Sequence, residues 1–316
     1  MERVTRMRSD VSVVTTLFNE ADGVIALLDS ILGGTASPAE VVVADGGSDD
    51  GTLDLLDGFA LTHPEVRVIK DSGGRSAGRN AAIGAASNQT IVCIDGGCIA
   101  RADWLERIIE PFENGARWVG GFYEPKGRNV MTKAIGLSMV YVREEAEGHF
   151  MPSARSMAFD RELWKEVGGF PEDVQFGEDT VFADSLMLAG HEMVFVPEAI
   201  VDWTPPLGLS EQARTMFAWG EGDGVKGLRS EHYKRVARAV AGSMAALLGL
   251  AAVEPRLIPL AAVPLVPVVR DHSRLKYRHM QGWTRWVLIP IATLNGLVAS
   301  LLGFLKGRTS RKRAER

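Results

Sequence analysis

Residues 91–98 of the chain read IVCIDGGC. Three β-branched residues and a cysteine lead into one carboxylate, Asp95, and two glycines follow it. A strand made only for burial does not need this ending, whereas a strand that delivers an acid to a ligand does, because glycine lets the ligand approach the backbone closely. The stretch predicts a buried strand that ends at a binding site.

Similar apolar runs come before this stretch, and segments with helical spacing lie between them. Strands that alternate with helices in this way indicate βαβ units and a parallel sheet, in which ligands bind outside the carboxyl ends of the strands. We therefore expect the residues just after each strand to carry the chemistry. The expected strands are 11–17, 40–44, 66–70 and 91–94, and the expected helices are 24–32, 52–60 and 78–86.

The region from about 117 to 205 has a less regular pattern. It still contains apolar runs that predict two further strands and two further helices. Gly190 lies at the C-terminal side of the second of these helices, where glycine commonly ends a helix. The expected strands are 118–123 and 193–196, and the expected helices are 161–167 and 179–189.

Charge is distributed unevenly along the 316 residues. The formal net charge is −5, yet residues 306–316 contain six basic residues and one acid. An acidic body argues against general nucleic-acid binding, so no nucleic-acid partner is expected. The basic tail suits an anionic lipid surface or a solvated end.

The two cysteines, Cys93 and Cys98, lie five residues apart across the end of one expected strand. An extended strand separates them too far for a disulfide, and two cysteines do not make a closed zinc site. Two cysteines that are not expected to form a disulfide indicate a reducing compartment. The N-terminus lacks the apolar core of a secretory signal, so we expect the body in the cytoplasm.

Apolar residues dominate the chain after about residue 235. Residues 239–253 and 257–269 are each shorter than the roughly 20 residues that span a bilayer. Residues 287–305 carry no charge, but basic residues flank them on both sides, which conflicts with a single crossing. We expect re-entrant or interfacial helices, or a hairpin, at the membrane; the alternative is a buried helical subdomain or a dimer interface. The expected domains are 1–230 and 231–316.

Two short stretches place acids after expected strands. Asp45, in VVVADGGSDDGT, could accept from a base N–H or a ribose hydroxyl, or it could simply be the acid of a turn. Asp95 could hold a divalent cation on a diphosphate. The position two residues later is Gly97, so water and phosphate oxygens must complete the shell, and the site is weaker than one with paired acids.

Two further stretches carry charges at expected helix starts. GGRSAGRN at 73–80 supplies Arg75 and Arg79, which suit phosphate or a nucleotide edge but could be surface arginines. FGEDT at 176–180 places Glu178 and Asp179 side by side. One of them could act as a general base on an acceptor hydroxyl, while the other caps the helix.

Taken together, these motifs resemble the inverting family 2 glycosyltransferases, which have the GT-A fold. The resemblance covers roughly residues 10–225 and rests on seven motifs in order. It implies a mixed, mostly parallel sheet flanked by helices, followed by a membrane-associated helical region. The motifs are TLFNE (16–20), DGGSDDGT (45–52), GRSAGRN (74–80), IDGGC with DWL (94–98 and 103–105), PSARSMAFDRELWKEVGGFPE (152–172), GEDT (177–180) and ARTMFAWGEG (213–222).

The resemblance implies a nucleotide-sugar donor bound by the N-terminal motifs. Glu20 and Asp45 match the acids that hold the nucleoside, and Arg75 and Arg79 match the basic stretch near the nucleotide. Asp95 matches the first acid of the DxD motif, which implies Mn²⁺ or Mg²⁺ at the diphosphate. The donor would be a UDP-, GDP- or dTDP-sugar.

The later motifs imply the acceptor side. Asp179 matches the catalytic base, with Glu178 beside it, and Arg155 falls in a segment that lines the sugar and acceptor side. Arg214 and Trp219 match a QxxRW-like element only loosely, which favours single transfer over processive synthesis. The acceptor would be a glycan or a lipid-linked glycan at the cytoplasmic face of the cell membrane.

Three other classes of protein compete with this interpretation. A sugar-phosphate nucleotidyltransferase needs a basic, glycine-rich signature near the N-terminus, and TLFNEADG has no Lys or Arg. An NAD-dependent enzyme needs G-x-G-x-x-G after the first strand, and this motif is absent. A catalytically inactive glycan-binding or scaffold protein is supported by Gly97 but opposed by the two acids of GEDT.

Overall fold

A computed structural model of the chain describes residues 7–146, 150–174, 176–253 and 255–314. The chain divides into two units, one made of Met1–Glu124 with Gly148–Thr204 and the other of Pro125–Glu147 with Pro205–Arg316. The helix after Thr204 falls in the second unit, where it packs with the C-terminal helix. The expected domains, 1–230 and 231–316, stay a prediction.

The described part of the first unit contains an eight-stranded sheet in the order β3-β2-β1-β4-β7-β6-β8-β5. Strands β3, β2, β1 and β4 run parallel, whereas β4 pairs with β7, β7 with β6, and β8 with β5 in antiparallel directions. The sheet is mixed, as expected. Its strands are β1 (Met7–Leu17), β2 (Ala36–Asp45), β3 (Val66–Lys70), β4 (Thr90–Cys93), β5 (Cys98–Ala100), β6 (Trp118–Pro125), β7 (Met157–Asp160) and β8 (Val194–Trp203).

The central strands are buried on both faces. Val13, Val42 and Ile91 are all 0% exposed, although neighbours along each strand point to opposite sides of the sheet. This is why the runs read as continuous apolar sequence. The strands β5 (three residues) and β7 (four residues) were not predicted.

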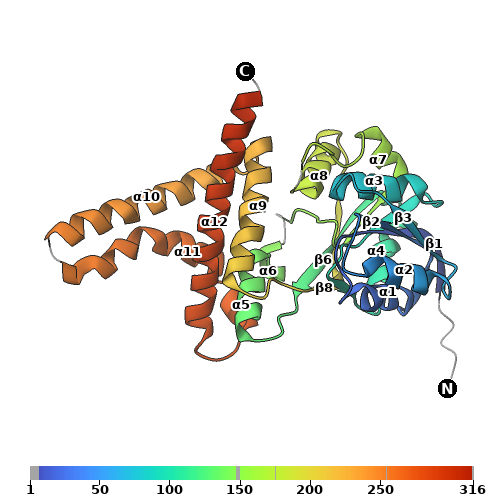
Figure 1. Cartoon of the computed structure of the whole chain (residues 1–316), viewed down its shortest axis with the longest axis horizontal. Coiled ribbons are helices and arrows are strands. Elements are labelled where there is room, and N and C mark those ends of the chain that lie inside the picture. The colour runs from blue at the N-terminus through green and yellow to red at the C-terminus, as the bar shows by residue number, and fades with distance from the viewer. Residues whose placement is uncertain (1–6, 147–149, 175, 254, 315–316) are drawn as a thin grey trace. The chain divides into compact units, whose positions relative to one another are not determined.

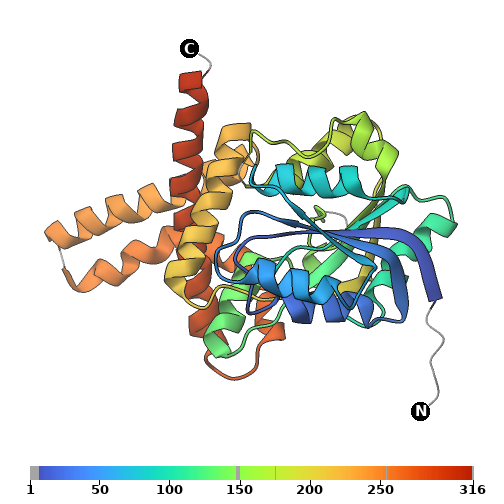
Figure 2. The same ribbon diagram turned by 45° about the vertical axis from the view of Figure 1, so that its right-hand side comes forward.

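Helices cover both faces of the sheet in this unit; α3 lies over one face and α1 with α2 over the other (Figures 1 and 2). Helix α3 begins at Arg75, three residues before the predicted start, because Gly74 has a φ of 97° and turns the chain into the helix. The helices are α1 (Val24–Leu32), α2 (Thr52–Ala60), α3 (Arg75–Ala85), α4 (Trp104–Glu113), α7 (Arg161–Glu166) and α8 (Glu178–Leu188).

The second unit is helical in its described residues. Asn129 and Thr132 form a capping box at the start of its first helix, which satisfies two backbone donors. In both views, α10 and α11 form a hairpin and α9 lies beside α12 (Figures 1 and 2). The elements are α5 (Val130–Met139), α6 (Arg143–Ala146), α9 (Leu209–Lys226), α10 (Ser230–Val253), the 3₁₀ segment η1 (Pro255–Leu265), α11 (Val266–Ser273), η2 (Lys276–His279) and α12 (Arg285–Ala314).

Glycines allow α9 and α12 to pack backbone against backbone. A Cβ atom on Gly220 would overlap the carbonyl oxygen of Ser300, and one on Gly303 would overlap that of Phe217. Among the described helices, only α12, over Arg285–Arg313, is long and apolar enough to cross a membrane, and 56% of its apolar window is buried within the protein. By length and composition α12 is thus a weak candidate for a membrane span.

Candidate active site

The predicted acids gather at one edge of the sheet. Leu17 at the end of β1 pairs with Asp45 at the end of β2, and Cys93 ends β4 beside Val14 of β1. Because these strands are parallel, the loops that follow them emerge at the same edge. The loops carrying Glu20, Asp45 and Asp95 are therefore neighbours, as we expected from the sequence.

Asp45 is completely buried and builds its own loop. Its Oδ1 accepts hydrogen bonds of 3.0 Å from the backbone N–H groups of Gly47 and Ser48, and its Oδ2 accepts one of 2.6 Å from the Ser48 hydroxyl. This is the turn interpretation of the motif. A direct contact between Asp45 and a nucleoside stays a prediction, and the structure shows the residue shaping the loop.

The loop after β1 is fastened to the loop after β2. Asn19 has a left-handed φ of 56°, and its backbone N–H donates to Ser48 Oγ across 2.9 Å. The next N–H, that of Glu20, donates to Thr52 Oγ1 across 2.8 Å. Sequence reasoning did not single out Ser48 or Thr52, although both lie in the quoted motif DGGSDDGT. Together these bonds hold Glu20 in position.

The two glycines after Asp95 have separate structural reasons. A Cβ on Gly96 would lie 3.0 Å from Glu20 Oε1 and 3.1 Å from Leu17 Cδ2, so a side chain there would displace the glutamate. Gly97 has a φ of 71°, which few residues other than glycine adopt. Gly96 therefore makes room for the Glu20 side chain, and Gly97 lets the chain turn after Asp95.

Glu20 lies in an electrostatically unfavourable place. Burial raises the pKa of its carboxyl group, and the neighbouring acids Asp50 and Asp95 raise it further. Carboxylates whose pKa is raised by burial and by neighbouring acids are concentrated at functional sites. This observation supports a ligand-binding role for the loop after β1.

Arg79 joins two acids from distant parts of the chain. Its Nη2 donates to Asp95 Oδ1 across 2.8 Å and its Nη1 donates to Glu178 Oε1 across 3.0 Å, while the arginine side chain is only 2% exposed. The guanidinium carbon lies 4.8 Å from the ring centre of Phe170, in cation–π range. Arg79 is therefore a buried residue that joins Asp95 to Glu178. It is not a surface arginine, which was the alternative interpretation of the motif.

The arginines and acids shift one another's ionisation. Burial would raise the pKa of Asp95, but Arg79, Arg155 and Arg75 outweigh it and lower that pKa. Burial raises the pKa of Glu178, and Asp179 adds to this rise against the pull of Arg79. Of these two acids, Glu178 is buried and Asp95 is partly exposed, and Asp95 is the one that stays ionised most readily.

The two acids of GEDT have different surroundings. Helix α8 begins at Glu178, and Gly177 before it has a left-handed φ of 78°. Glu178 is 3% exposed and paired with Arg79, whereas Asp179 is half-buried and its Oδ1 accepts a 2.8 Å hydrogen bond from the N–H of Thr180. Asp179 is therefore the more accessible carboxylate of the pair.

Arg155 is held between two aromatic rings. Its guanidinium carbon lies 4.9 Å from the ring centre of Tyr123 and 4.8 Å from that of Trp203. Burial would lower the pKa of Arg155, but Tyr123, Asp95 and Asp179 are among the groups that raise it overall. Tyr123 and Trp203 were not predicted, because an aromatic residue in a strand normally indicates only core packing.

The remaining predicted residues differ in their positions. Arg75 is half exposed, its Nε lies 3.9 Å from Glu178 Oε1, and its guanidinium carbon lies 5.3 Å from the ring centre of Phe176. Arg214 and Trp219 are on α9, in the second unit, and their part in a site stays a prediction.

The residues around Asp95 fit a divalent cation only if the ligand supplies most of the shell. Among the described residues, no group of three or more His, Cys, Asp and Glu could hold a metal. Arg79 is hydrogen-bonded to one oxygen of Asp95, and position 97 has no side chain. Mg²⁺ and Mn²⁺ sites on phosphates do occur with one protein carboxylate, so Asp95 would be the protein ligand.

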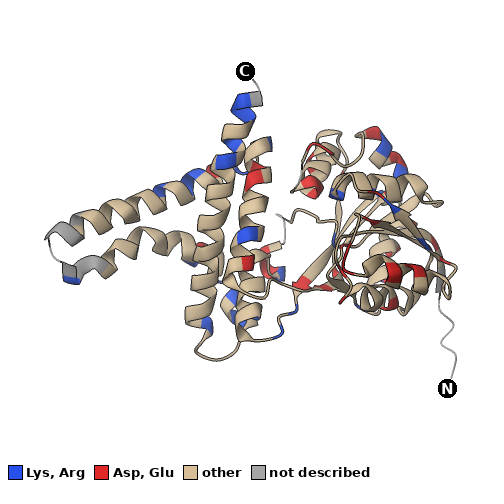
Figure 3. Ribbon diagram, in the orientation of Figure 1, with Lys and Arg blue, Asp and Glu red and all other residues tan. Residues whose placement is uncertain are grey.

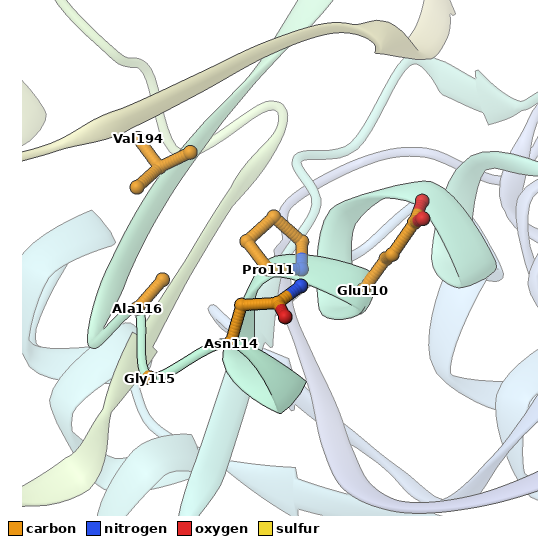
Figure 4. Close-up of a pocket in the computed structure, with 6 residues that line it drawn as sticks. All are labelled: Glu110, Pro111, Asn114, Gly115, Ala116 and Val194. Atoms are coloured by element: carbon orange, nitrogen blue, oxygen red, sulfur yellow. The ribbon is translucent and has the colours of Figure 1, made fainter.

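A separate hollow of about 440 Å³ lies on the first unit. It is formed by the end of α4, the residues after it and the first residue of β8 (Figure 4). Glu110 is the only ionisable residue among those that line it, and none of the predicted site residues does so. We therefore place the chemistry at the carboxyl ends of the strands and not in this hollow.

Comparisons with known proteins identify the family. Residues 12–167 match the model of glycosyl transferase family 2. The chain is 24% identical over 220 residues to glycosyltransferase AglE of Haloferax volcanii, covering 67% of this chain and 72% of AglE. It is 26% identical over 264 residues to the succinoglycan biosynthesis protein ExoA of Rhizobium meliloti, covering 77% of this chain and 80% of ExoA.

The fold also has a solved counterpart. The mannosyltransferase PcManGT from Pyrobaculum calidifontis, solved in complex with GDP-Man and Mn²⁺, superposes with a TM-score of 0.62 at 19% sequence identity. The superposition covers 96% of this chain and 88% of PcManGT. The likeness confirms the expected GT-A fold.

Proposed function

Because residues 12–167 form a family 2 glycosyltransferase domain, the chain is a glycosyltransferase, and from this premise we propose that it moves a sugar from a nucleotide-sugar donor to a glycan or lipid-linked acceptor with inversion. The observation that carries the proposal is the buried bridge of Arg79, which holds Asp95 and Glu178 at one place although 83 residues separate them in the sequence. Charged side chains are seldom buried unless they are paired, and clusters of such groups are concentrated at functional sites.

The donor would bind over the loops that follow β1, β2 and β4. Glu20, with its raised pKa, and the loop built by Asp45 are positioned for the nucleoside, and half-exposed Arg75 for its charged end. The mannosyltransferase with the similar fold was solved with GDP-Man, which supports a sugar activated by a nucleoside diphosphate. We propose a UDP-, GDP- or dTDP-sugar.

The general base would be Asp179. An inverting transfer needs one carboxylate that takes the proton from the acceptor hydroxyl while the hydroxyl oxygen attacks the anomeric carbon. Glu178 is unsuited to this, since it is buried and bound by Arg79. Asp179 is accessible, and the bond from the Thr180 N–H orients it. Glu178 would then position the start of α8.

The departing diphosphate would be stabilised by Asp95 and the arginines. A divalent cation held by Asp95 would, when bound, neutralise charge on the diphosphate oxygens. Arg155 would contribute from its place between Tyr123 and Trp203, because the two rings and a 3.2 Å hydrogen bond from its Nη1 to Ser153 Oγ fix the plane of the guanidinium. A cation fixed in this way costs little reorganisation during the reaction.

The enzyme would work at the cytoplasmic face of the cell membrane, on an acceptor presented there. The apolar helices of the second unit and the basic end of the chain support this placement. ExoA, a protein of succinoglycan biosynthesis, is a relative of this chain, which favours a glycan acceptor.

Hydrolysis of a panel of sugar nucleotides, with and without Mn²⁺, tests the proposal. We expect slow hydrolysis and micromolar binding of one nucleotide class. The competing function is an inactive glycan-binding scaffold, which Gly97 favours because it removes the second acid of the motif. A chain that binds glycans but neither binds nor hydrolyses any sugar nucleotide would establish the scaffold instead.

A further inference from the structure

The side-chain amide of Asn80, on α3, spends all of its hydrogen bonds on one distant segment. Its Oδ1 accepts from the Phe170 N–H across 2.9 Å and from Trp164 Nε1 across 3.0 Å. Its Nδ2 donates to the Phe170 carbonyl oxygen across 2.8 Å and to Glu172 Oε1 across 3.0 Å. An asparagine amide has two N–H donors and one oxygen with two lone pairs, so its full capacity is used. The amide therefore fastens residues 164–172 to α3.

The backbone around Phe170 is shaped for this amide. In an antiparallel pair of strands a residue exchanges its N–H and C=O bonds with the residue opposite, and here the Asn80 amide takes the place of that residue. The glycines before Phe170, Gly168 and Gly169, both have a left-handed φ, of 81° and 82°. A Cβ on Gly169 would lie 2.9 Å from Asn80 Oδ1, whereas one on Gly168 would have nothing within 4 Å among the described residues. Position 169 thus lacks a side chain where the amide approaches.

The ring of Phe170 connects this bonding to the candidate active site. The ring is 1% exposed, and the guanidinium carbon of Arg79 lies 4.8 Å from its centre. Phe182 of α8 stacks on it, with 4.2 Å between the ring centres and 20° between the planes. Phe182 follows Asp179 by three residues, which is about one helical turn. Asn80 is thereby linked to the two helix starts at which basic residues of α3 and acidic residues of α8 meet (Figure 3).

The ion pair of Arg79 does not by itself fix the direction of α8. It joins one atom of Glu178 to α3 across 3.0 Å, and the helix could still pivot about that contact. The stacking of Phe182 on Phe170 adds a second contact, one turn further along the helix. Such precision matters for a general base, because a displacement of about 1 Å can lower a rate about a hundredfold.

We propose that Asn80 is a positioning residue for the sugar transfer: it holds Phe170 against Arg79 and Phe182, and thereby fixes the start of α8, from which Asp179 acts. This inference rests on the proposed function, in which Asp179 is the general base. It adds a residue that acts through the protein and not on the donor.

Hydrolysis and binding by the full chain test the proposal. The substrates are radiolabelled UDP-glucose, GDP-mannose and dTDP-glucose with Mn²⁺, at a temperature at which circular dichroism shows every variant folded. Asn80→Ala should lower kcat about a hundredfold, because the base is displaced. The Kd of the matching nucleoside diphosphate should stay within about threefold of wild type, since Arg79 keeps its ion pair with Asp95. An equal loss in both quantities, or an unchanged kcat, would overturn the proposal.

The two glycines before Phe170 provide a matched pair of variants. Gly169→Ala puts a methyl group against the Asn80 amide and should lower kcat at least about tenfold without touching Asn80 itself. Gly168→Ala has nearly the same φ and therefore the same backbone strain, but no such collision, and it should stay within about threefold of wild type. If both variants lose kcat equally, strain in the loop explains the loss, and Asn80 is not a positioning residue.

Amide hydrogen exchange separates a failure of this inference from a failure of the proposed function. In wild type the Val181 N–H donates to the Gly177 carbonyl oxygen across 3.1 Å at the start of α8. In Asn80→Ala this turn should exchange at least about tenfold faster, while α2 stays unchanged. If wild type binds and hydrolyses no sugar nucleotide, the proposed function ends, and faster exchange would still assign the placement of α8 to Asn80. Unchanged exchange would overturn the inference even in an active glycosyltransferase.

Discussion

Arg79 donates from Nη2 to Oδ1 of Asp95 across 2.8 Å, with the arginine side chain 2% exposed and the aspartate side chain 24% exposed. The pair links the first helical turns after β3 to the loop after β4. Because Arg79 also binds Glu178, a single guanidinium joins the loop after β4 to the start of α8. The predictions below test what this arrangement does.

Removal of the buried cation should destabilise the protein. Arg79→Met leaves two carboxylates without their partner, and breaking a buried ion pair costs about 3–5 kcal/mol. Chemical denaturation of the full chain measures the loss. Arg107→Met is the matched control, because Arg107 is 48% exposed and pairs with Asp103 on the surface, where such a pair contributes about 1 kcal/mol or less. Equal losses in both variants would contradict a special role for Arg79.

Asp179→Asn should abolish transfer and keep donor binding. The amide preserves the shape of the side chain but cannot take the acceptor proton, so kcat should fall at least about a thousandfold. Calorimetry with the nucleotide sugar should give a Kd within about threefold of wild type.

Glu178→Gln provides the contrast for Asp179. It keeps a hydrogen-bond acceptor for Arg79 and should leave a measurable fraction of the rate. If nucleotide binding is lost in Asp179→Asn as fully as the rate, Asp179 binds the donor and is not the base.

Glu20 should make the stability of the protein depend on pH. Its folded-state pKa is raised above the usual 4.5, so ionisation costs more in the folded protein than in the unfolded chain. That cost is fully present above the folded pKa and absent below about 4.5. Glu20→Gln should therefore raise the thermal midpoint near pH 8 and have little effect near pH 4, as scanning calorimetry at both values would record. Glu113→Gln, at an exposed glutamate at the end of α4, is the control measured alongside.

Gly97→Asp should strengthen metal binding at some cost in stability. No heavy atom lies within 4 Å of a Cβ built on Gly97, so there is room for a side chain, but its φ of 71° costs roughly 1 kcal/mol for residues other than glycine. We expect Mn²⁺ affinity, measured by electron paramagnetic resonance with nucleoside diphosphate present, to rise about tenfold. Gly97→Ala carries the same backbone strain and should not raise it; an equal rise in both would refute the assignment of Asp95 as the ligand.

Two glycine substitutions should have opposite effects on stability. Gly303→Ala places a methyl group against the Phe217 carbonyl in the α9–α12 contact and should cost about 1–3 kcal/mol. Gly58→Ala, in α2 with nothing within 4 Å of the added Cβ, should be neutral or stabilise by up to about 1 kcal/mol. Thermal unfolding compares the two. A harmless Gly303→Ala would indicate that α12 is loosely held and free for lipid.

Local sequence determined the order of elements in the first unit. The bounds of α1, α2 and β3 agree with the predicted 24–32, 52–60 and 66–70, because each is a periodic run that glycine or a polar turn interrupts. The acids after β1, β2 and β4 could be located for the same reason, since a parallel sheet brings the ends of its strands to one edge.

Only the tertiary structure decided which charges meet and which surfaces are covered. Nothing near Arg79 in the sequence indicates Glu178, 99 residues later, and nothing near Arg155 indicates the rings of Tyr123 and Trp203. Likewise, the uncharged runs of α10 and α12 look alike in sequence, yet Met244 and Leu248 of α10 are 61% and 72% exposed, whereas 56% of the apolar window of α12 is buried. Burial and ion pairing depend on partners supplied by distant parts of the chain, whereas the periodicity of a helix or strand is contained in its own residues.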